Sequence, residues 1–152
     1  MDLLALCVLS VLDADGVLSE EGATTRAELV AEACRDEGDK AAECVHVLPV
    51  LWGLETAFTF SLTPRSRGSC GVGQVVPTKN TPTCKEMEVP RVGLQAAWYV
   101  WGVKRKATHT VQGAFRAYNG HPRHKDGYGA RGARFYKKAV KKCQDLMPKG
   151  TP

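Results

Sequence analysis

The chain has 152 residues, of which 43% are hydrophobic and 24% are charged, and its formal net charge at pH 7 is +5. A chain of this size and apolar content can bury one core, so we expect a single, monomeric domain over residues 1–152 with an N-terminal helical extension at about 1–24. No apolar run approaches the roughly 20 residues of a transmembrane helix, so we expect no membrane span.

The charge is divided unevenly along the chain. Residues 1–64 hold 12 Asp and Glu against 3 Lys and Arg, whereas residues 65–152 hold 4 acidic and 18 basic residues. A basic half of this kind would concentrate a polyanion near it, such as nucleic acid, an anionic cell-wall polymer or lipopolysaccharide. The alternative is a solvated basic face.

The first third of the chain predicts helices. Residues 3–12, LLALCVLSVL, resemble the apolar part of a signal peptide, but Asp2 stands where positive charge is expected and no basic residue precedes Arg26. We therefore expect a packed amphipathic helix there and no clear signal peptide. Thr25 and Glu28 form a TxxE capping box, which predicts a second helix from Thr25 that Gly38 closes.

A third helix is expected from about residue 39, and it carries the most informative acid of the chain. Its apolar face continues into Glu55 through residues spaced four, three and four apart, namely Cys44, Leu48, Leu51 and Glu55. Pro49 should kink this helix or mark a restart. A carboxyl at the end of an apolar stripe is desolvated, which raises its pKa and makes Glu55 a candidate proton donor. The alternative is a glutamate that points to water.

Residues 59–89 form a long region rich in turn signals, with a glycine-rich irregular or short β segment at about 65–80. Loops of this length inside a compact domain are usually functional. Its glycines allow positive φ or a close approach of the backbone to a ligand, and Gln74 offers both a donor and an acceptor. An extended segment is expected at 74–76. On their own these residues indicate only a tight turn.

The second half again predicts helices, so the fold class is mainly α. Pro90 suits the first turn of a helix. The residues expected to share its apolar face are Leu94, Trp98 and Trp101, those of the next helix are Val111, Ala114, Phe115 and Tyr118, and those of the last are Tyr136, Val140, Cys143 and Met147.

The six cysteines match no zinc-binding spacing, and the histidines form no HExxH motif. We therefore expect no metal and no cofactor. Local disulfides, Cys34–Cys44 and Cys70–Cys84, are plausible outside the cytoplasm, and buried free thiols are the alternative. His121 and His124 flank Arg123 and could bind anionic groups, unless they belong to a solvated loop.

Three ordered motifs resemble the soluble lytic transglycosylases of the lysozyme-like superfamily. Residues 55–58 read ETAF, where the family has E-S-x-F/W. Residues 68–77 read GSCGVGQVVP, where the family has G-A-x-G-L-x-Q-I/L-x-P, and residues 117–120 read AYNG, similar to the family's A-Y-N-A-G. The resemblance covers about residues 25–145 and implies a goose-type, lytic-transglycosylase-like helical domain.

The resemblance implies that Glu55 is the catalytic acid and then the base. Gln74 and Val76 would line the glycan cleft, Tyr118 would stand near Glu55 on the opposite wall, and Asn119 would hold the local structure. The substrate-binding set taken from the motifs is Phe58, Gly71, Gln74, Val76, Tyr118 and Asn119. The substrate would be the glycan strand of peptidoglycan, with anionic wall polymers as further contacts of the basic half.

The chain departs from the family pattern in three places: Thr56 replaces serine, Val76 stands where methionine is common, and Gly120 follows Asn119 directly. The implied reaction cleaves the bond between N-acetylmuramic acid and N-acetylglucosamine and leaves a 1,6-anhydromuramyl end. A hydrolytic muramidase on the same bond is an alternative. The implied location is the bacterial cell wall or periplasm, as for a bacteriophage lysin or virion-associated enzyme.

Functions of other classes remain open. Aromatic residues in the basic half could stack on bases while Lys and Arg neutralise phosphates, as in a nucleic-acid-binding module; these residues are Tyr99, Phe115, Tyr118, Tyr128, Phe135 and Tyr136. Their helical spacing favours core positions instead. A non-catalytic structural protein is a further alternative.

Overall fold

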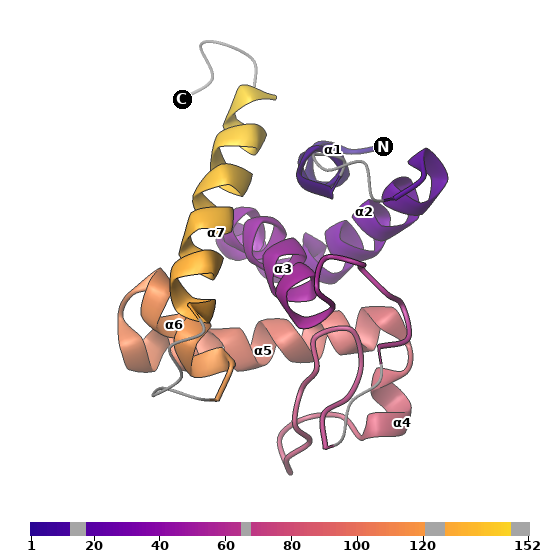
Figure 1. Cartoon of the computed structure of the whole chain (residues 1–152). Helices are drawn as coiled ribbons and strands as arrows, with labels where there is room; N and C mark the ends of the chain where they lie inside the picture. Colours follow the sequence, from indigo (N-terminus) through magenta and orange to yellow (C-terminus); the bar gives the residue numbers. More distant parts are fainter. Residues whose placement is uncertain (13–17, 65–67, 121–126, 147–152) are drawn as a thin grey trace.

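The computed structural model describes residues 1–12, 18–64, 68–120 and 127–146. In this part the chain is mainly helical, as predicted (Figure 1). The elements are α1 (Leu3–Leu12), α2 (Glu20–Cys34), the 3-10 helix η2 (Arg35–Lys40), α3 (Ala41–Glu55), α4 (Cys84–Met87), α5 (Pro90–Thr108), α6 (Val111–Tyr118) and α7 (Tyr128–Asp145). None of the described helices is long and apolar enough to span a membrane.

Helix α3 is the centre of the fold. It contacts α1, α2, α5 and α7, and its buried residues run almost without interruption from Cys44 to Gly53. In Figure 1, α5 crosses the lower part of the molecule and α7 stands upright beside α3. A helix that is apolar on all sides has to be enclosed by others, which explains the position of α3. The helix passes through the buried Pro49 without a break, so the predicted restart is wrong.

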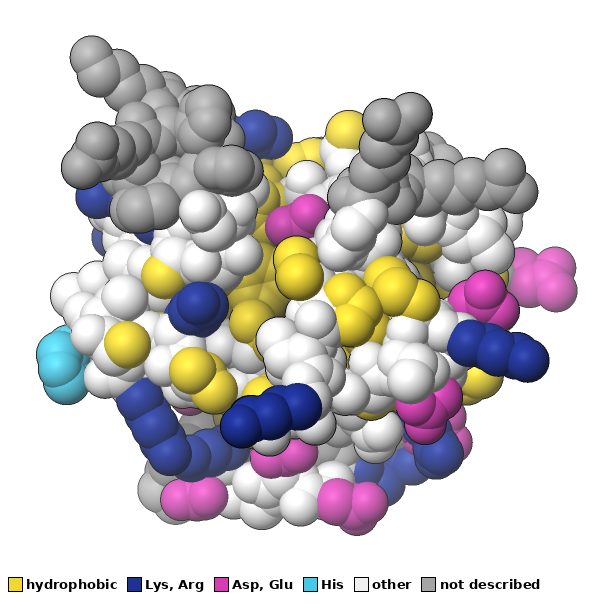
Figure 2. Space-filling model, turned by 90° about the horizontal axis from the view of Figure 1, so that it is seen from below, with side chains coloured by type: hydrophobic (Ala, Val, Ile, Leu, Met, Phe, Trp, Pro, Cys, Tyr) yellow, Lys and Arg dark blue, Asp and Glu magenta, His cyan; other side chains and the backbone are white. Residues whose placement is uncertain are grey.

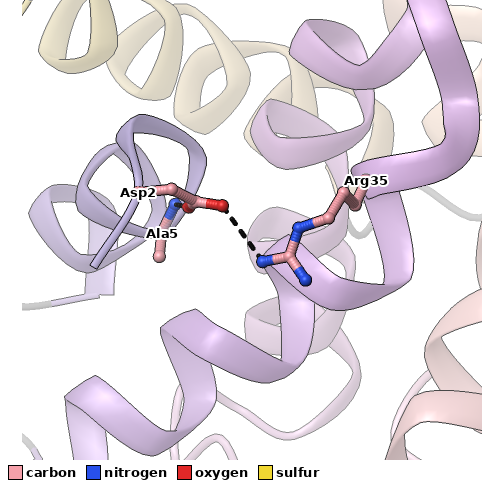
Figure 3. A network of polar contacts seen from close by, with 3 residues as sticks. All are labelled: Asp2, Ala5 and Arg35. Atoms are coloured by element: carbon pink, nitrogen blue, oxygen red, sulfur yellow. Dashed lines mark hydrogen bonds and ion pairs between the residues drawn. The ribbon is translucent and has the colours of Figure 1, made fainter.

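The N-terminal segment is a packed helix, as predicted. Val8 and Leu12 of α1 are buried in the common core. Asp2 caps α1, because its carboxylate accepts a hydrogen bond from the backbone N–H of Ala5 at 2.9 Å, and it also pairs with Arg35 at 3.0 Å (Figure 3). The acidic residue that argued against a signal peptide therefore begins a helix.

The predicted start of α2 is wrong. The helix begins at Glu20, where the Ser19 side chain accepts a hydrogen bond from the N–H of Gly22 at 3.1 Å. Thr25 lies inside the helix, and its hydroxyl donates to the carbonyl of Glu21 at 3.0 Å. A serine followed by two glutamates is a stronger start signal, because the acids also suit the helix dipole. The helix ends at Cys34, and Gly38 marks a break at φ +61° within η2.

The region between α3 and α5 contains one element that the sequence analysis missed. Helix α4 is short and begins with a complete capping box between Thr83 and Glu86. The predicted extended segment is also largely wrong, because Gln74 has a left-handed φ of +48°. The strand pairing in the described part of this region is a single antiparallel bridge between Cys70 and Val75.

Two glycines bring this loop against α5. A Cβ atom at Gly73 would lie 2.5 Å from Cβ of Ala97, and one at Gly71 would lie 2.8 Å from the carbonyl oxygen of Met87. Gly71 also has a φ of +69°. Both glycines therefore permit close packing of the loop on α4 and α5, and this packing holds the loop beside the end of α3.

The helices of the second half agree with the predictions in type and order. Pro90 occupies the first turn of α5, and Phe115 of α6 is fully buried. In α7 the buried residues include Ala139 and Cys143, while Tyr136 and Val140 are half-buried. The predicted contribution of Met147 lies outside the described residues.

Three disulfides join the helices. Cys34–Cys44 and Cys70–Cys84 confirm the two local pairs expected from the sequence. The third, Cys7–Cys143, links α1 to α7 across a sequence separation of 136 residues. It ties the two ends of the described chain together, which no local pattern could indicate.

Candidate active site

Glu55 is the last residue of α3, and the chain reverses sharply directly after it. Ala57, Phe58 and Phe60 all have positive φ, at 51°, 59° and 51°. The N–H of Phe58 donates to the carbonyl of Gly53 at 2.7 Å, which closes the helix end. Gly53 is needed there because a Cβ would lie 2.7 Å from the Phe58 ring. This tight reversal fixes the backbone on which Glu55 stands.

Thr56 holds the reversal together through its hydroxyl. The hydroxyl donates to the carbonyl of Trp52 at 2.7 Å and accepts from the N–H of Phe60 at 3.0 Å. A serine, the residue of the family pattern, could make the same two hydrogen bonds. The departure at this position therefore keeps the chemistry that the turn requires.

We expect Thr56→Val to lower the free energy of unfolding by about 1 to 3 kcal/mol, because it leaves the N–H of Phe60 without its acceptor at nearly constant side-chain volume. Urea unfolding would measure the change. Thr56→Ser is the matched control and should stay within about 1 kcal/mol of the parent. Equal losses in both variants would contradict the role of the hydroxyl.

The carboxyl of Glu55 is largely withdrawn from solvent and has one strong partner. The Tyr128 hydroxyl, at the start of α7, donates a hydrogen bond to Oε1 of Glu55 at 2.6 Å. Burial raises the pKa of Glu55 above its ordinary value, and the hydrogen bond from Tyr128 lowers it by a smaller amount. A carboxyl in this environment holds its proton to a higher pH than an exposed glutamate and can act as a general acid.

Tyr118 connects this acid to the glycine-rich loop. Its hydroxyl donates to the carbonyl of Gly73 at 2.6 Å. Burial raises the pKa of Tyr118 well above its usual range, and the nearby charge of Glu55 raises it further. The phenol therefore stays neutral and keeps its hydrogen bond. Two motifs that are far apart in the sequence, at 68–77 and 117–120, are thus joined by this hydrogen bond, and the charge of Glu55 in the third acts on the same tyrosine.

A groove runs along the outer side of Tyr118. Its cavity volume is about 330 Å³, and its walls come from the loop after Val76, from α5 and from the end of α6. Val76 is 65% exposed beside it. The polar lining residues are Thr78, Asn80, Thr81, Tyr99, Lys104 and Tyr118. Figure 2, which views the molecule from the side of α5, shows hydrophobic side chains gathered in the middle of this face with Lys and Arg side chains near them. We call this cavity the Tyr118 groove.

The other residues expected to bind substrate lie in different surroundings. Both ends of the Gln74 amide are engaged within the loop, because Oε1 accepts from the Ser69 hydroxyl and Nε2 donates to the carbonyl of Gly71, each at 2.9 Å. The ring of Phe58 packs on Phe135, with centroids 4.8 Å apart, and lines a separate apolar cavity. Asn119 caps α6 with its backbone, which agrees with a structural role.

Tyr128 is the site residue that sequence reasoning missed. It is 9% exposed and contacts Glu55 from 73 residues further along the chain. The sequence placed it only among the aromatic residues of the basic half. Its position directly after a glycine at the start of a helix is the one local signal, and that signal does not point to Glu55.

The described residues contain one cluster with the composition of a metal site. His46 lies close to Cys7 and Cys143, with the candidate ligand atoms within 4.8 Å of one another. The two cysteines form a disulfide, so their sulfur atoms are committed to each other. Burial lowers the pKa of His46, whose ring contacts the edge of Tyr136. The proposed anion contacts of His121 and His124 lie outside the described residues.

Comparison of the chain with protein-family models, with curated proteins and with solved structures finds no match among any of the three.

Proposed function

We propose that this protein is a peptidoglycan-degrading lytic transglycosylase with a lysozyme-like helical fold and with Glu55 as its catalytic acid and base. The observation that carries the proposal is the environment of Glu55, a partly buried carboxyl with a raised pKa that accepts a hydrogen bond from Tyr128 and acts electrostatically on Tyr118, a lining residue of the Tyr118 groove. The hydrogen bond between Tyr118 and Gly73, which joins two of the three motifs that resemble those of the family, further supports the proposal.

In the proposed reaction, protonated Glu55 donates its proton to the glycosidic oxygen between N-acetylmuramic acid and N-acetylglucosamine, and the bond from that oxygen to C1 breaks. The substrate's acetamido oxygen stabilises the positive C1. The carboxylate of Glu55 then takes the proton of the muramyl 6-hydroxyl, whose oxygen bonds to C1 and releases the acetamido group. The enzyme returns to its protonated state and no water is consumed.

A single carboxylate suits this route. Most glycosidases, whether they retain or invert the configuration at the anomeric carbon, need a second carboxylate. It acts as the nucleophile in the retaining enzymes and as the general base in the inverting ones. In the described part of the chain, the pKa of Glu55 responds to burial and to Tyr128, and no other acidic residue contributes to it. We therefore assign both proton transfers to Glu55, with Tyr128 holding its Oε1 in place.

The three disulfides support a place of action outside the cytoplasm, because such bonds persist in oxidising compartments. The bacterial cell wall or periplasm meets this condition, as it would for a bacteriophage lysin or virion-associated enzyme. The nucleic-acid-binding alternative loses support, because Phe115 and Tyr128, two of its stacking candidates, are buried.

Mass spectrometry of purified sacculi after digestion tests the proposal. We expect fragments that end in 1,6-anhydromuramic acid. Reducing muramyl ends would instead identify a hydrolytic muramidase that uses the same acid. The absence of soluble fragments, together with an unchanged turbidity of the sacculi, would contradict both forms of the proposal.

The hydrogen bond from Tyr128 predicts a shift of the pH–activity profile. Tyr128→Phe removes a donor that stabilises the charged form of Glu55, so the pKa of Glu55 should rise further. Because the first step needs the protonated acid, the alkaline limb of the profile should move to higher pH. The profile of kcat/KM against pH for sacculus digestion would measure this shift.

Tyr136→Phe is the control for the loss of a phenol, since Tyr136 lies on α7 as Tyr128 does and is absent from the contacts that set the pKa of Glu55. Its alkaline limb should match that of the parent. A shift of the Tyr128→Phe profile to lower pH would contradict the assigned role of the hydrogen bond.

A further inference from the structure

The outer face of α5 carries a second groove that continues the Tyr118 groove. It has a volume of about 320 Å³ and lies between α5 and η2. The two grooves share Tyr99 and Val103 as lining residues, so they meet along one side of α5. We call the second cavity the α5 groove.

The surface where the two grooves meet is unusually apolar for an exposed helix face. Tyr99 is 47% exposed and Val103 is 50% exposed. The half-buried Trp98 lines the α5 groove beside them. Tyr99 and Val103 lie one turn apart on the same side of the helix, and Trp98 directly precedes Tyr99 in the sequence. Exposed aromatic residues next to a groove offer flat apolar faces with a polar edge, which suit the faces of sugar rings.

Basic residues border this aromatic surface. Lys104 lines the Tyr118 groove, and Lys40 and Lys106 line the α5 groove. Glu37 is the carboxylate among the lining residues of the α5 groove, so positive charge predominates along the two grooves together. The combination of aromatic faces with lysines fits a chain of sugars that carries negatively charged substituents.

Gly102 keeps the α5 groove open. It lies in the middle of α5 and lines the groove, and a Cβ added there would meet no atom within 4 Å. A glycine inside a helix is unfavourable compared with alanine, and no close packing contact accounts for this one. The space above it remains available to a ligand.

We propose that the two grooves form an extended binding track for the glycan strand, in which Trp98 and Tyr99 contact sugar rings and Lys104 and Lys106 pair with carboxylates of the peptide stems. This inference rests on the proposed function, because it takes peptidoglycan as the ligand. The track leads to Tyr118, the lining residue on whose phenol the charge of Glu55 acts. Because the lysines of the track pair with stem carboxylates, strands that carry peptide stems are the preferred substrate over strands without them.

The test is a binding assay in the non-cleaving Glu55→Gln background, so that no turnover changes the ligand. The probes are purified Gram-negative sacculi and the soluble glycan strands left after an amidase has removed the stems. Lys104→Gln with Lys106→Gln should weaken sacculus binding about threefold to tenfold and reduce its salt dependence, since each exposed ion pair contributes modestly. The same variant should lose less affinity for the stem-free strands, because the amidase leaves only the lactyl carboxylate on each muramic acid, whereas each stem carries several carboxylates.

Substitutions at Gly102 separate groove filling from damage to the fold. Gly102→Glu puts bulk and negative charge into open space on a helix, so it should fold and weaken sacculus binding at least as much as the lysine variant. Gly102→Ala is its control and should bind as the parent does. Lys137→Gln with Lys141→Gln, two exposed lysines of α7, controls for the change in net charge and should have little effect.

The proposed track would be overturned if the double lysine substitutions on α5 and on α7 weakened sacculus binding equally. It would also be overturned if Gly102→Glu bound sacculi as the parent does. An equal loss of affinity for stem-free strands would overturn the assignment of the lysines to stem carboxylates. These binding results are independent of catalysis. If the variants bound as expected but the parent protein did not cleave peptidoglycan, the transglycosylase proposal would be rejected and the binding track would stand.

Discussion

Glu55→Gln is expected to reduce the cleavage of peptidoglycan by about 10³-fold or more. General acid–base catalysis by one group contributes about 10² to 10⁴ in rate, and Glu55 is assigned to both proton transfers. The glutamine side chain has the same shape and can still accept the hydrogen bond from Tyr128, but it cannot donate a proton to the leaving oxygen. Release of soluble muropeptides from sacculi would measure the loss.

The stability of this variant distinguishes catalysis from folding. Burial raises the pKa of Glu55 in the folded state, so between the unfolded and the folded pKa the folded protein binds more protons, and stability falls as the pH rises. At a pH above both pKa values, the parent bears the free-energy cost of holding a charged carboxylate in a partly buried position, whereas the neutral glutamine does not. We expect the Tm of Glu55→Gln at pH 7 to equal or exceed that of the parent. Retained lytic activity in this well-folded variant would refute the assignment of Glu55.

Removal of the Cys7–Cys143 disulfide is expected to cause the largest loss of stability. The bond closes a loop of 136 residues, for which chain entropy predicts about 5 kcal/mol. Net stabilities of domains are about 5 to 15 kcal/mol, so the loss is a large share of the total. Urea unfolding of Cys7→Ala with Cys143→Ala would measure it. The m-value should rise, because the unfolded chain becomes less compact.

The matched control removes Cys34–Cys44, whose sequence separation is 10 residues. The same relation predicts a loss of about 3 kcal/mol, smaller by about 2 kcal/mol than for the long-range bond. In both variants the remaining cysteines stay paired, so no new thiol–disulfide exchange arises. An equal or larger effect at Cys34–Cys44 would show that loop length does not govern the contribution of these disulfides.

The TxxE pattern shows what a local sequence pattern can and cannot predict about a helix. It occurs at Thr25 and again at Thr83, and only the second forms a capping box. At Thr83 no stronger start signal competes. Upstream of Thr25, Ser19 and the acids that follow it begin the helix earlier, and the exposed threonine hydroxyl donates to the carbonyl of Glu21 in the preceding turn. The existence of the longer helices was therefore predictable, whereas the short α4 and the helix boundaries were not, because a boundary depends on which of several weak caps forms.

The candidate site also contains features that could be predicted from the sequence and features that could not. That Glu55 ends an apolar helical stripe follows from spacing alone, and the raised pKa agrees with that prediction. The local environment of Gln74 did not follow, because its side chain serves the loop in which it lies. The glycines of that loop were expected to allow positive φ or a close approach of the backbone; Gly68 and Gly71 have positive φ, and Gly71 and Gly73 approach α4 and α5.

The sequence by itself determined the longer helices, the two short-range disulfides and the face on which Glu55 stands, because each depends on residues within a few turns of one another. The tertiary structure alone decided that Tyr128 holds the acid, that Tyr118 bonds the loop at Gly73, and that Cys7 meets Cys143. These contacts join residues 45 to 136 positions apart. Their formation depends on how all the helices pack around α3, and no local period records that arrangement.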